Sequence, residues 1–265
     1  LVVQDIFLTE TAEFADVILP ASSFFEKEGT YTNTDRRVQL GKAIVQPPGE
    51  ARLDWQVICE LSNRLGYRMD YNSTAEVFAE FTSLSPSYAG LLHENLGASG
   101  KIWPCHDPEH SLGQEVLFQD HFPTANGLAK FVPAEFSEAD DLPDAAYPLV
   151  LNTGRVLEHW HTGTMTRRAF ALDALQPTPF VEIPPDDLRP LNVLHGEEVL
   201  VKSKRGEITL PVRESLNVQR GSVFIPFHFR EAGANLLTND ALDPYGKIPE
   251  FKFCAVRVEK KRQVG

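Results

Sequence analysis

Residues 199–212 read VLVKSKRGEITLPV, and the fold is decided by the pattern in this stretch. Two runs rich in apolar and β-branched residues, Val199–Ser203 and Glu207–Val212, lie on either side of Lys204-Arg205-Gly206. Short β-branched runs are typical of strands, and a glycine between them suits a tight turn. The stretch therefore predicts a β-hairpin.

Further strand candidates surround this hairpin on both sides. They share its short length and apolar character, and they are Tyr147–Leu151, Phe180–Ile183, Ser222–Phe229 and Phe251–Val258. Six short strands over residues 147–258 predict a small β-barrel, with helices near Arg167–Ala174 and Asp186–Leu194.

The N-terminal part has a different pattern. Leu1–Val3 and Val17–Pro20 are short apolar runs separated by a helical stretch at Thr11–Ala15, which predicts an α/β crossover with parallel strands. A polar loop is expected over Glu26–Arg37. An amphipathic helix is expected to begin at Asp54 and to end at Gly66, with its apolar face formed by Trp55, Val57, Ile58, Leu61 and Leu65.

The pattern weakens between these two regions, where proline, glycine and acidic residues interrupt every apolar run. We therefore expect three parts: an α/β domain over residues 1–105, an irregular connection over 106–145 and a barrel domain over 146–265. The first residues read as a strand already in progress, which suggests a piece of a longer polypeptide.

Composition excludes several classes of protein. The chain has 265 residues, 42% of them hydrophobic, which is enough for a real core, and its net charge of −12 disfavours nucleic acid as a partner. Cys59, Cys105 and Cys254 form no C-x-x-C pair, which argues against a disulfide framework, a zinc ribbon or an iron–sulfur cluster held by this chain alone. Separate thiols suit a reducing, cytoplasmic location, and without an apolar stretch of 18 residues no direct membrane insertion is expected.

A polar segment follows the strand candidate Tyr147–Leu151. Gly154 lets a backbone approach an anion closely, and Arg155 and the hydroxyl-rich continuation to Arg168 suit phosphate. A solvated loop leading into a helix explains the same residues. His159 and His161 alternate and would share one side of an extended segment, either for a metal or for hydrogen bonds within the loop.

Two other features admit more than one interpretation. The H-x-x-E-H pattern at residues 106–110 is found in zinc peptidases, but Pro108 disfavours the helix that this site needs. Lys252 would share a strand face with Cys254 and Val256, so it lies at a sheet edge or reaches an anion.

Taken together, several motifs resemble the molybdopterin oxidoreductase family. They are Val2–Asp5, Ala15–Pro20, Glu26–Thr30 and Asn33–Arg37 at one end, and Thr153–Thr162, Asn235–Thr238, Asp243-Pro244 and Phe251–Val256 at the other. Within the family, Pro226–Phe229 and Leu242–Val258 are most similar to the catalytic α subunit of formate dehydrogenases. Thr153–Thr162 is also similar to periplasmic-type nitrate reductases, and a non-catalytic barrel that binds a nucleotide or a partner is a further alternative.

The resemblance implies the fold class and the site. It implies α/β architecture: the C-terminal part of an α/β cofactor-binding domain, followed by a double-psi β-barrel molybdopterin-dinucleotide-binding domain. The residues implied to bind the cofactor are Gln4, Asp5, Lys27, Asp54, Thr153, Gly154, Arg155, Val156, Leu157, Glu158, His159, Trp160, His161, Thr162, Phe227, Asn235 and Lys252.

The implied cofactor is bis-molybdopterin guanine dinucleotide with molybdenum or tungsten, shared with a missing N-terminal part. No catalytic or metal-ligating residue is expected in this chain, and a [4Fe-4S] cluster is expected only in the full-length enzyme, so the chain alone should not oxidise formate. The implied partners are the rest of the catalytic subunit and iron–sulfur or diaphorase electron-transfer subunits. An incomplete cofactor domain would also expose apolar surface, so the chain is expected to self-associate.

Overall fold

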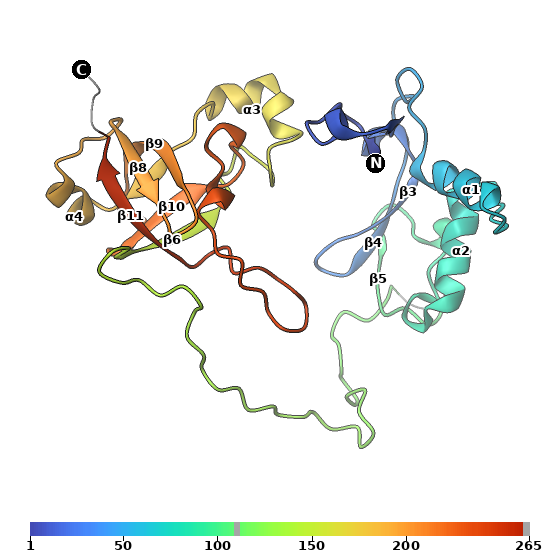
Figure 1. The fold of residues 1–265 in the computed structure, drawn as a ribbon. Coiled ribbons are helices and arrows are strands. Elements are labelled where there is room, and N and C mark those ends of the chain that lie inside the picture. The colour runs from blue at the N-terminus through green and yellow to red at the C-terminus, as the bar shows by residue number, and fades with distance from the viewer. Residues whose placement is uncertain (109–111, 262–265) are drawn as a thin grey trace. The chain divides into compact units, whose positions relative to one another are not determined.

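The chain forms two compact units, each with its own hydrophobic core (Figure 1). A computed structural model describes residues 1–108 and 112–261. The first unit spans Leu1–Val132 and the second Pro133–Gly265, so the division falls inside the expected connection over residues 106–145.

The second unit is a closed barrel of six strands. Its strands lie in the order β10-β6-β11-β8-β9-β7 around the barrel. Their bounds are β6 Leu149–Gly154, β7 Val181–Ile183, β8 Glu198–Lys202, β9 Glu207–Glu214, β10 Ser222–Pro226 and β11 Cys254–Lys260. All six predicted strands are confirmed, with ends displaced by a few residues. The predicted hairpin is β8–β9, in which Lys202 lies opposite Glu207.

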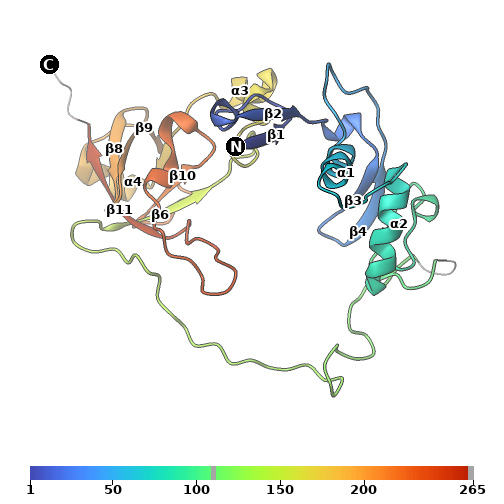
Figure 2. The ribbon, with the colours of Figure 1, turned by 45° about the vertical axis from the view of Figure 1, so that its right-hand side comes forward.

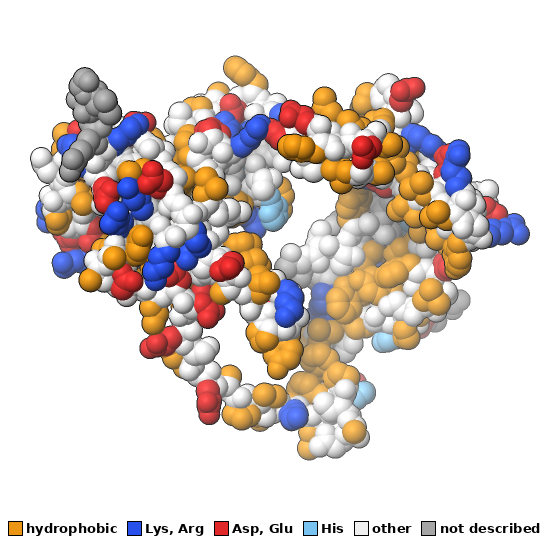
Figure 3. Space-filling model, in the orientation of Figure 1, with side chains coloured by type: hydrophobic (Ala, Val, Ile, Leu, Met, Phe, Trp, Pro, Cys, Tyr) orange, Lys and Arg blue, Asp and Glu red, His pale blue; other side chains and the backbone are white. Residues whose placement is uncertain are grey.

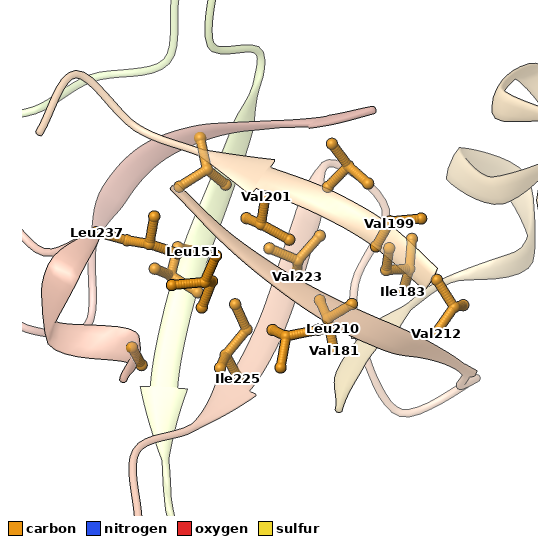
Figure 4. Close-up of a cluster of buried hydrophobic side chains, with 14 of the residues drawn as sticks. Leu151, Val181, Ile183, Val199, Val201, Leu210, Val212, Val223, Ile225 and Leu237 are labelled. Carbon is orange, nitrogen blue, oxygen red and sulfur yellow. The ribbon is translucent and has the colours of Figure 1, made fainter. Parts of the chain in front are cut away.

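Alternating side chains fill the barrel. In β9, Ile208, Leu210 and Val212 are buried while the residues between them are partly exposed, as expected for a strand with one face on a core. Figure 4 shows Leu210 and Val212 among inward-pointing aliphatic side chains of the other strands, including Leu151 and Val223. Burial of this apolar surface is the main term that stabilises the barrel.

Strand direction gathers several predicted site residues at one end of the barrel. β6 and β10 are parallel and pair Gly154 with Pro226, so both strands end at the same edge. β11 is antiparallel to β6 and begins at that edge, where Cys254 pairs with Leu151. Thr153–Arg155, Phe227 and Lys252 therefore lie close together although they are far apart in sequence.

Short helices decorate the barrel. The helix predicted near Arg167–Ala174 consists of a 3-10 turn, Thr166–Arg168, followed by α3, Phe170–Leu175. The one predicted at Asp186–Leu194 is α4, Pro185–Leu188, with a 3-10 turn directly after it.

The first unit contains the predicted parallel crossover. β1, Val2–Asp5, pairs in parallel with β2, Val17–Pro20, and Figure 2 shows these two strands side by side. A 3-10 turn at Ala12–Phe14 connects them.

The polar loop predicted over Glu26–Arg37 is wrong for Gly29–Thr32 and Arg37, which belong to strands. β3, Gly29–Thr32, and β4, Arg37–Gly41, form an antiparallel hairpin there, and β5, Lys101–Ile102, adds a third strand to β4. Threonine and tyrosine favour strands despite their polar groups, whereas the prediction weighed polarity alone.

Two helices complete the first unit. α1 is Asp54–Arg64, as predicted, and α2 is Thr74–Leu84, which was not predicted. The apolar face of α1 is largely uncovered, since Ile58, Leu61 and Leu65 are 55%, 49% and 86% exposed. Hydrophobic side chains, orange in Figure 3, are visible on the surface of the molecule. None of the helices within residues 1–108 and 112–261 combines the length and the apolar character that a membrane span requires.

Candidate functional site

Three of the four site residues predicted in the first unit form one cluster. Gln4 Nε2 donates a hydrogen bond to Asp54 Oδ1 at 2.7 Å, and the Lys27 ammonium forms an ion pair with Asp54 Oδ2. Lys27 Nζ also donates to the carbonyl of Ser22 at 3.2 Å. The cluster joins residues that are 50 positions apart in the sequence.

The course of the backbone brings Gln4 and Asp54 together. Gln4 lies near the carboxyl end of β1, and Asp54 is the first residue of α1. A parallel bridge between Ala21 and Arg52 brings the start of α1 beside the end of β2. The carboxyl end of parallel strands is where open α/β sheets bind ligands, so the cluster lies where a nucleotide group is expected.

Asp5, the fourth residue, uses its carboxylate locally. Its Oδ1 accepts a hydrogen bond from the backbone N–H of Phe7 at 3.0 Å. The side chain thus fixes the turn after β1, one residue away from the Gln4 cluster.

Ser22 is a member of this region that the sequence reasoning missed. It is 2% exposed, and its hydroxyl is buried with no hydrogen-bond partner in the described residues. A serine after a strand is common, and nothing in its spacing distinguished it. A buried unpartnered hydroxyl beside Lys27 suits a site whose ligand supplies the missing partner.

In the second unit, Thr153 and Gly154 connect three predicted segments. The Thr153 hydroxyl donates to the carbonyl of Phe251 at 2.9 Å, and the N–H of Phe227 donates to the carbonyl of Gly154 at 3.1 Å. Thr153 is buried, so its side chain fastens the segment before Lys252 onto the end of β6.

Gly154 packs against a neighbouring strand of the barrel. A Cβ at this position would lie 2.6 Å from Cε2 of Phe224, so the Phe224 ring would have to shift to make room. The structure therefore explains this glycine by its contact with a neighbouring strand, where the sequence suggested close approach to an anion.

Arg155 is an exposed cation at this end of the barrel. Its guanidinium lies 4.6 Å from the centre of the Trp160 ring, a cation–π contact. Among residues 1–108 and 112–261, no carboxylate forms an ion pair with Arg155. The stacked guanidinium can therefore bind an anionic group without first breaking a salt bridge.

The alternation predicted for His159 and His161 is wrong. His159 is 2% exposed, with Nε2 2.8 Å from the carbonyl of Gln176 and Nδ1 3.2 Å from the hydroxyl of Thr166. His161 is exposed and has φ of 47°. The segment turns instead of running extended, so one imidazole anchors the loop from inside and the other faces solvent.

The other loop residues are mostly accessible. Leu157 is 98% exposed, Trp160 is 60% exposed, and Val156 and Glu158 are half-buried. The hydroxyl of Thr162 lies 3.1 Å from that of Thr164.

Two predicted residues lie outside this loop. Asn235 is exposed within the 3-10 turn Ala234–Leu236, and Lys252 is exposed immediately before β11. The predicted alternation around Lys252 is wrong, because the strand begins at Cys254 and Cys254, Ala255 and Val256 are all buried in the closed barrel.

His228 is a buried imidazole beside this loop that the sequence reasoning missed. It is 1% exposed, both ring nitrogens lack a hydrogen-bond partner in the described residues, and its ring centre lies 4.5 Å from that of His159. Burial lowers the pKa of His228 to about 4, with the neighbouring charges of His159 and Arg167 acting in the same direction. Unpartnered buried nitrogens are costly in a finished structure, so they suit a site completed by a ligand. The hydrogen-bonding side chains described above thus fit a polar, phosphate-bearing cofactor.

Two residues of the H-x-x-E-H motif, Glu109 and His110, lie outside the residues that the structure describes.

Two family models match the chain. Residues 149–255 match the molydopterin dinucleotide binding domain, and residues 1–64 match molybdopterin oxidoreductase. The chain belongs to the molybdopterin oxidoreductase family. Every predicted site residue of this family member falls inside one of the two matched ranges.

Individual proteins show the same relationship. The chain is 50% identical over 262 residues to the F420-dependent formate dehydrogenase subunit alpha of Methanocaldococcus jannaschii, covering 98% of this chain and 39% of that one. It is 38% identical to formate dehydrogenase H of Escherichia coli, covering 97% of this chain and 36% of that one, and 40% identical to the assimilatory nitrate reductase catalytic subunit of Bacillus subtilis, covering 96% and 37%. The chain thus spans about two fifths of the length of these relatives.

A solved structure shows a similar fold. Acetylene hydratase from Pelobacter acetylenicus has a TM-score of 0.71 at 18% identity, covering 98% of this chain and 40% of that one. At this identity the likeness concerns the fold alone, and it agrees with the expected α/β segment and barrel.

Proposed function

We propose that this chain is the C-terminal cofactor-binding part of a molybdenum- or tungsten-dependent formate dehydrogenase. In the full enzyme, it would hold bis-molybdopterin guanine dinucleotide together with the rest of the catalytic subunit. The observation that carries the proposal is the 50% identity along nearly the whole chain to a formate dehydrogenase α subunit. Two further formate dehydrogenase α subunits, from Methanococcus maripaludis, are 45% and 43% identical to it.

The barrel end would hold the anionic parts of the cofactor. Arg155 and Lys252 are exposed cations at the edge where β6 and β10 end and β11 begins. The exposed Thr162 and the backbone of the same loop add neutral hydrogen-bonding groups. Two cations and neutral donors at one edge suit phosphate oxygens.

The first unit would hold the nucleoside part of one of the two dinucleotides. The side chains of Gln4 and Asp54 combine an amide and a carboxylate at the end of β1, a pairing suited to the edge of a purine or to ribose hydroxyls. Lys27 orients the Asp54 carboxylate through their ion pair. Ser22 offers its unpartnered hydroxyl next to them.

The cofactor, when bound, supplies the two-electron oxidation of formate to CO2. The residues of this chain bind and orient it, and the buried His159 holds the loop from beneath. Formate would contact groups carried by the rest of the catalytic subunit. Iron–sulfur or diaphorase subunits would receive the electrons, and the cytoplasmic location remains a prediction.

Nitrate reduction is the second candidate function, because the assimilatory nitrate reductase of Bacillus subtilis is 40% identical to the chain. The test is to purify the full-length enzyme and assay formate oxidation and nitrate reduction with artificial electron acceptors and donors. Formate turnover without nitrate turnover supports the proposal, and the reverse result would replace it with the second candidate.

The role of Arg155 is tested separately from the choice of substrate. We expect Arg155→Ala in the full-length enzyme to weaken cofactor binding about 10- to 150-fold, the effect of losing a charge-assisted hydrogen bond. Cofactor content per protein should fall while the Michaelis constant for formate in the loaded fraction stays unchanged. Arg220→Ala, which removes an exposed arginine of the same unit, is the control. Full occupancy with a raised Michaelis constant would make Arg155 a substrate residue instead.

A further inference from the structure

The first unit contains a cavity of about 420 Å³ between the β3 hairpin and α2. Its lining includes Phe78, Phe81, Tyr88 and His93, together with threonines of β3 and Thr74 at the start of α2. None of Gln4, Lys27 or Asp54 lines it, so this cavity is not the cofactor cluster described above. Its size lies within the range of small-molecule sites.

One wall of the cavity is aromatic. The rings of Phe78 and Phe81 are stacked with centres 5.9 Å apart, and Tyr88 meets Phe81 edge-on at 5.0 Å. Phe81 remains 46% exposed, so part of this wall has no cover in the described structure. Aromatic faces and edges of this kind favour a planar ring as the occupant.

His93 supplies a polar group to the same cavity. Its side chain is 10% exposed, and its Nε2 is buried without a hydrogen-bond partner in the described residues. Burial lowers the pKa of His93, against the opposing effect of Glu28, so the imidazole is neutral at neutral pH. Nδ1 lies 4.0 Å from the Glu28 carboxylate, which favours the proton on Nδ1 and leaves Nε2 as an acceptor.

We infer that this cavity binds an uncharged planar aromatic ring that carries an N–H or O–H group, which donates to Nε2 of His93. The threonine hydroxyls offer hydrogen bonds to other polar substituents of the ring. An anionic ring is disfavoured because Glu28 lies beside His93. The inference goes beyond the proposed function and does not depend on it. The ring is either that of a free small molecule or that of a tryptophan or tyrosine from the longer protein.

The test compares indole with 1-methylindole on the 265-residue chain. The two probes differ only in the N–H group, and their dissociation constants can be measured by ligand-detected NMR. We expect indole to bind about three- to tenfold more tightly, the effect of one net hydrogen bond. Equal affinity of the two probes, or no saturable binding of either, would overturn the inference.

Three variants test whether the two probes bind in this cavity. His93→Phe keeps a ring but removes the acceptor, so indole should lose its advantage over 1-methylindole. Phe81→Ala removes part of the exposed wall, and both probes should bind more weakly. His121→Phe, at an exposed histidine of the same unit, should leave both dissociation constants unchanged. Loss of the indole advantage in His121→Phe but not in His93→Phe would contradict the assignment.

The full-length enzyme distinguishes the two sources of the ring. If a tryptophan or tyrosine of the longer protein fills the cavity, indole should bind the 265-residue chain but not the full-length enzyme. If the ligand is a free molecule, indole should bind both with the same preference over 1-methylindole. Indole binding to both without that preference would contradict the inference.

Discussion

At the scale of single residues, His228 is a buried imidazole with charged neighbours. Its imidazole is buried next to His159, the guanidinium of Arg167 and the carboxylate of Glu231. Arg167 is itself held by ion pairs with Asp173 at 3.2 Å and Glu231 at 2.7 Å. Protonation of His228 would add a second positive charge beside Arg167 in a dry environment.

We therefore expect acid to destabilise the second unit through His228. The pKa is about 4 in the folded chain and near 6.5 when unfolded, so the unfolded state takes up the proton first as pH falls. The free energy of unfolding should decrease between pH 6.5 and 4, by about 3 kcal/mol from this residue. Chemical denaturation across this range would show a shallower pH slope in His228→Phe than in the wild type. The same slope in both would refute the assignment, and His195→Phe, at an exposed histidine, serves as the control.

Individual side chains of the site were only partly predictable from sequence. The positions of Gln4, Lys27 and Asp54 came from a resemblance, and their meeting in space needed the parallel bridge between Ala21 and Arg52. Burial is a property of the folded chain, so no spacing rule could show that His159 lies inside and His161 outside. Ser22 and His228 were missed for the same reason.

At the scale of elements, the β8–β9 hairpin is tied to the segment that precedes the barrel. Asp141 is 5% exposed and accepts from Arg205 Nη2 at 2.5 Å, from Lys204 Nζ at 3.2 Å and from the N–H of Ala255 at 3.0 Å. The sequence placed Asp141 in an acidic stretch of the connection. The structure instead makes it a buried anchor between the hairpin turn and β11.

We expect Asp141→Asn to destabilise the second unit by about 3–5 kcal/mol, the cost of breaking a buried ion pair from one side. Urea unfolding of the chain, followed by tryptophan fluorescence and circular dichroism, measures the loss. Asp140→Asn changes the exposed neighbouring carboxylate and should cost less than about 0.5 kcal/mol. Equal effects of the two substitutions would show that Asp141 acts only through the net charge of the chain.

Strands with one face on the barrel core were predictable because a period of two is visible in the sequence. The β3–β4 hairpin was not, because β3 is rich in threonine and the third strand comes from Lys101–Ile102, far along the chain. Arg36 also belongs to the motif that resembles the family. Its guanidinium donates to the carbonyls of Trp103, Gln114 and Glu115, a structural role that no local pattern indicates.

At the scale of the whole molecule, the chain exposes much apolar surface. The α1 face formed by Ile58, Leu61 and Leu65 is exposed, and Val2 and Val17 of the two-stranded sheet are 61% and 48% exposed. In the full-length enzyme we expect the rest of the catalytic subunit to cover these surfaces. Taken alone, the chain should use them to bind a second copy of itself.

Sedimentation velocity over a range of concentrations tests this expectation. The 265-residue chain should form dimers or larger species, and Leu61→Glu should shift it toward the monomer. Leu216→Glu alters a leucine of the other unit that is more exposed than Leu61, at 89%, and should leave the distribution unchanged. A wild-type chain that stays monomeric at high concentration would contradict the expectation.

The position of β11 in the barrel has a consequence for synthesis on the ribosome. This last strand lies between β6 and β8, so the ring of hydrogen bonds stays open until residue 260 has left the exit tunnel. During translation, β6 lacks its β11 partner until about a hundred more residues have been made. Pairings between strands so far apart in sequence form slowly. We therefore expect the barrel to stay open, with its apolar inner face uncovered, until its final strand has been made.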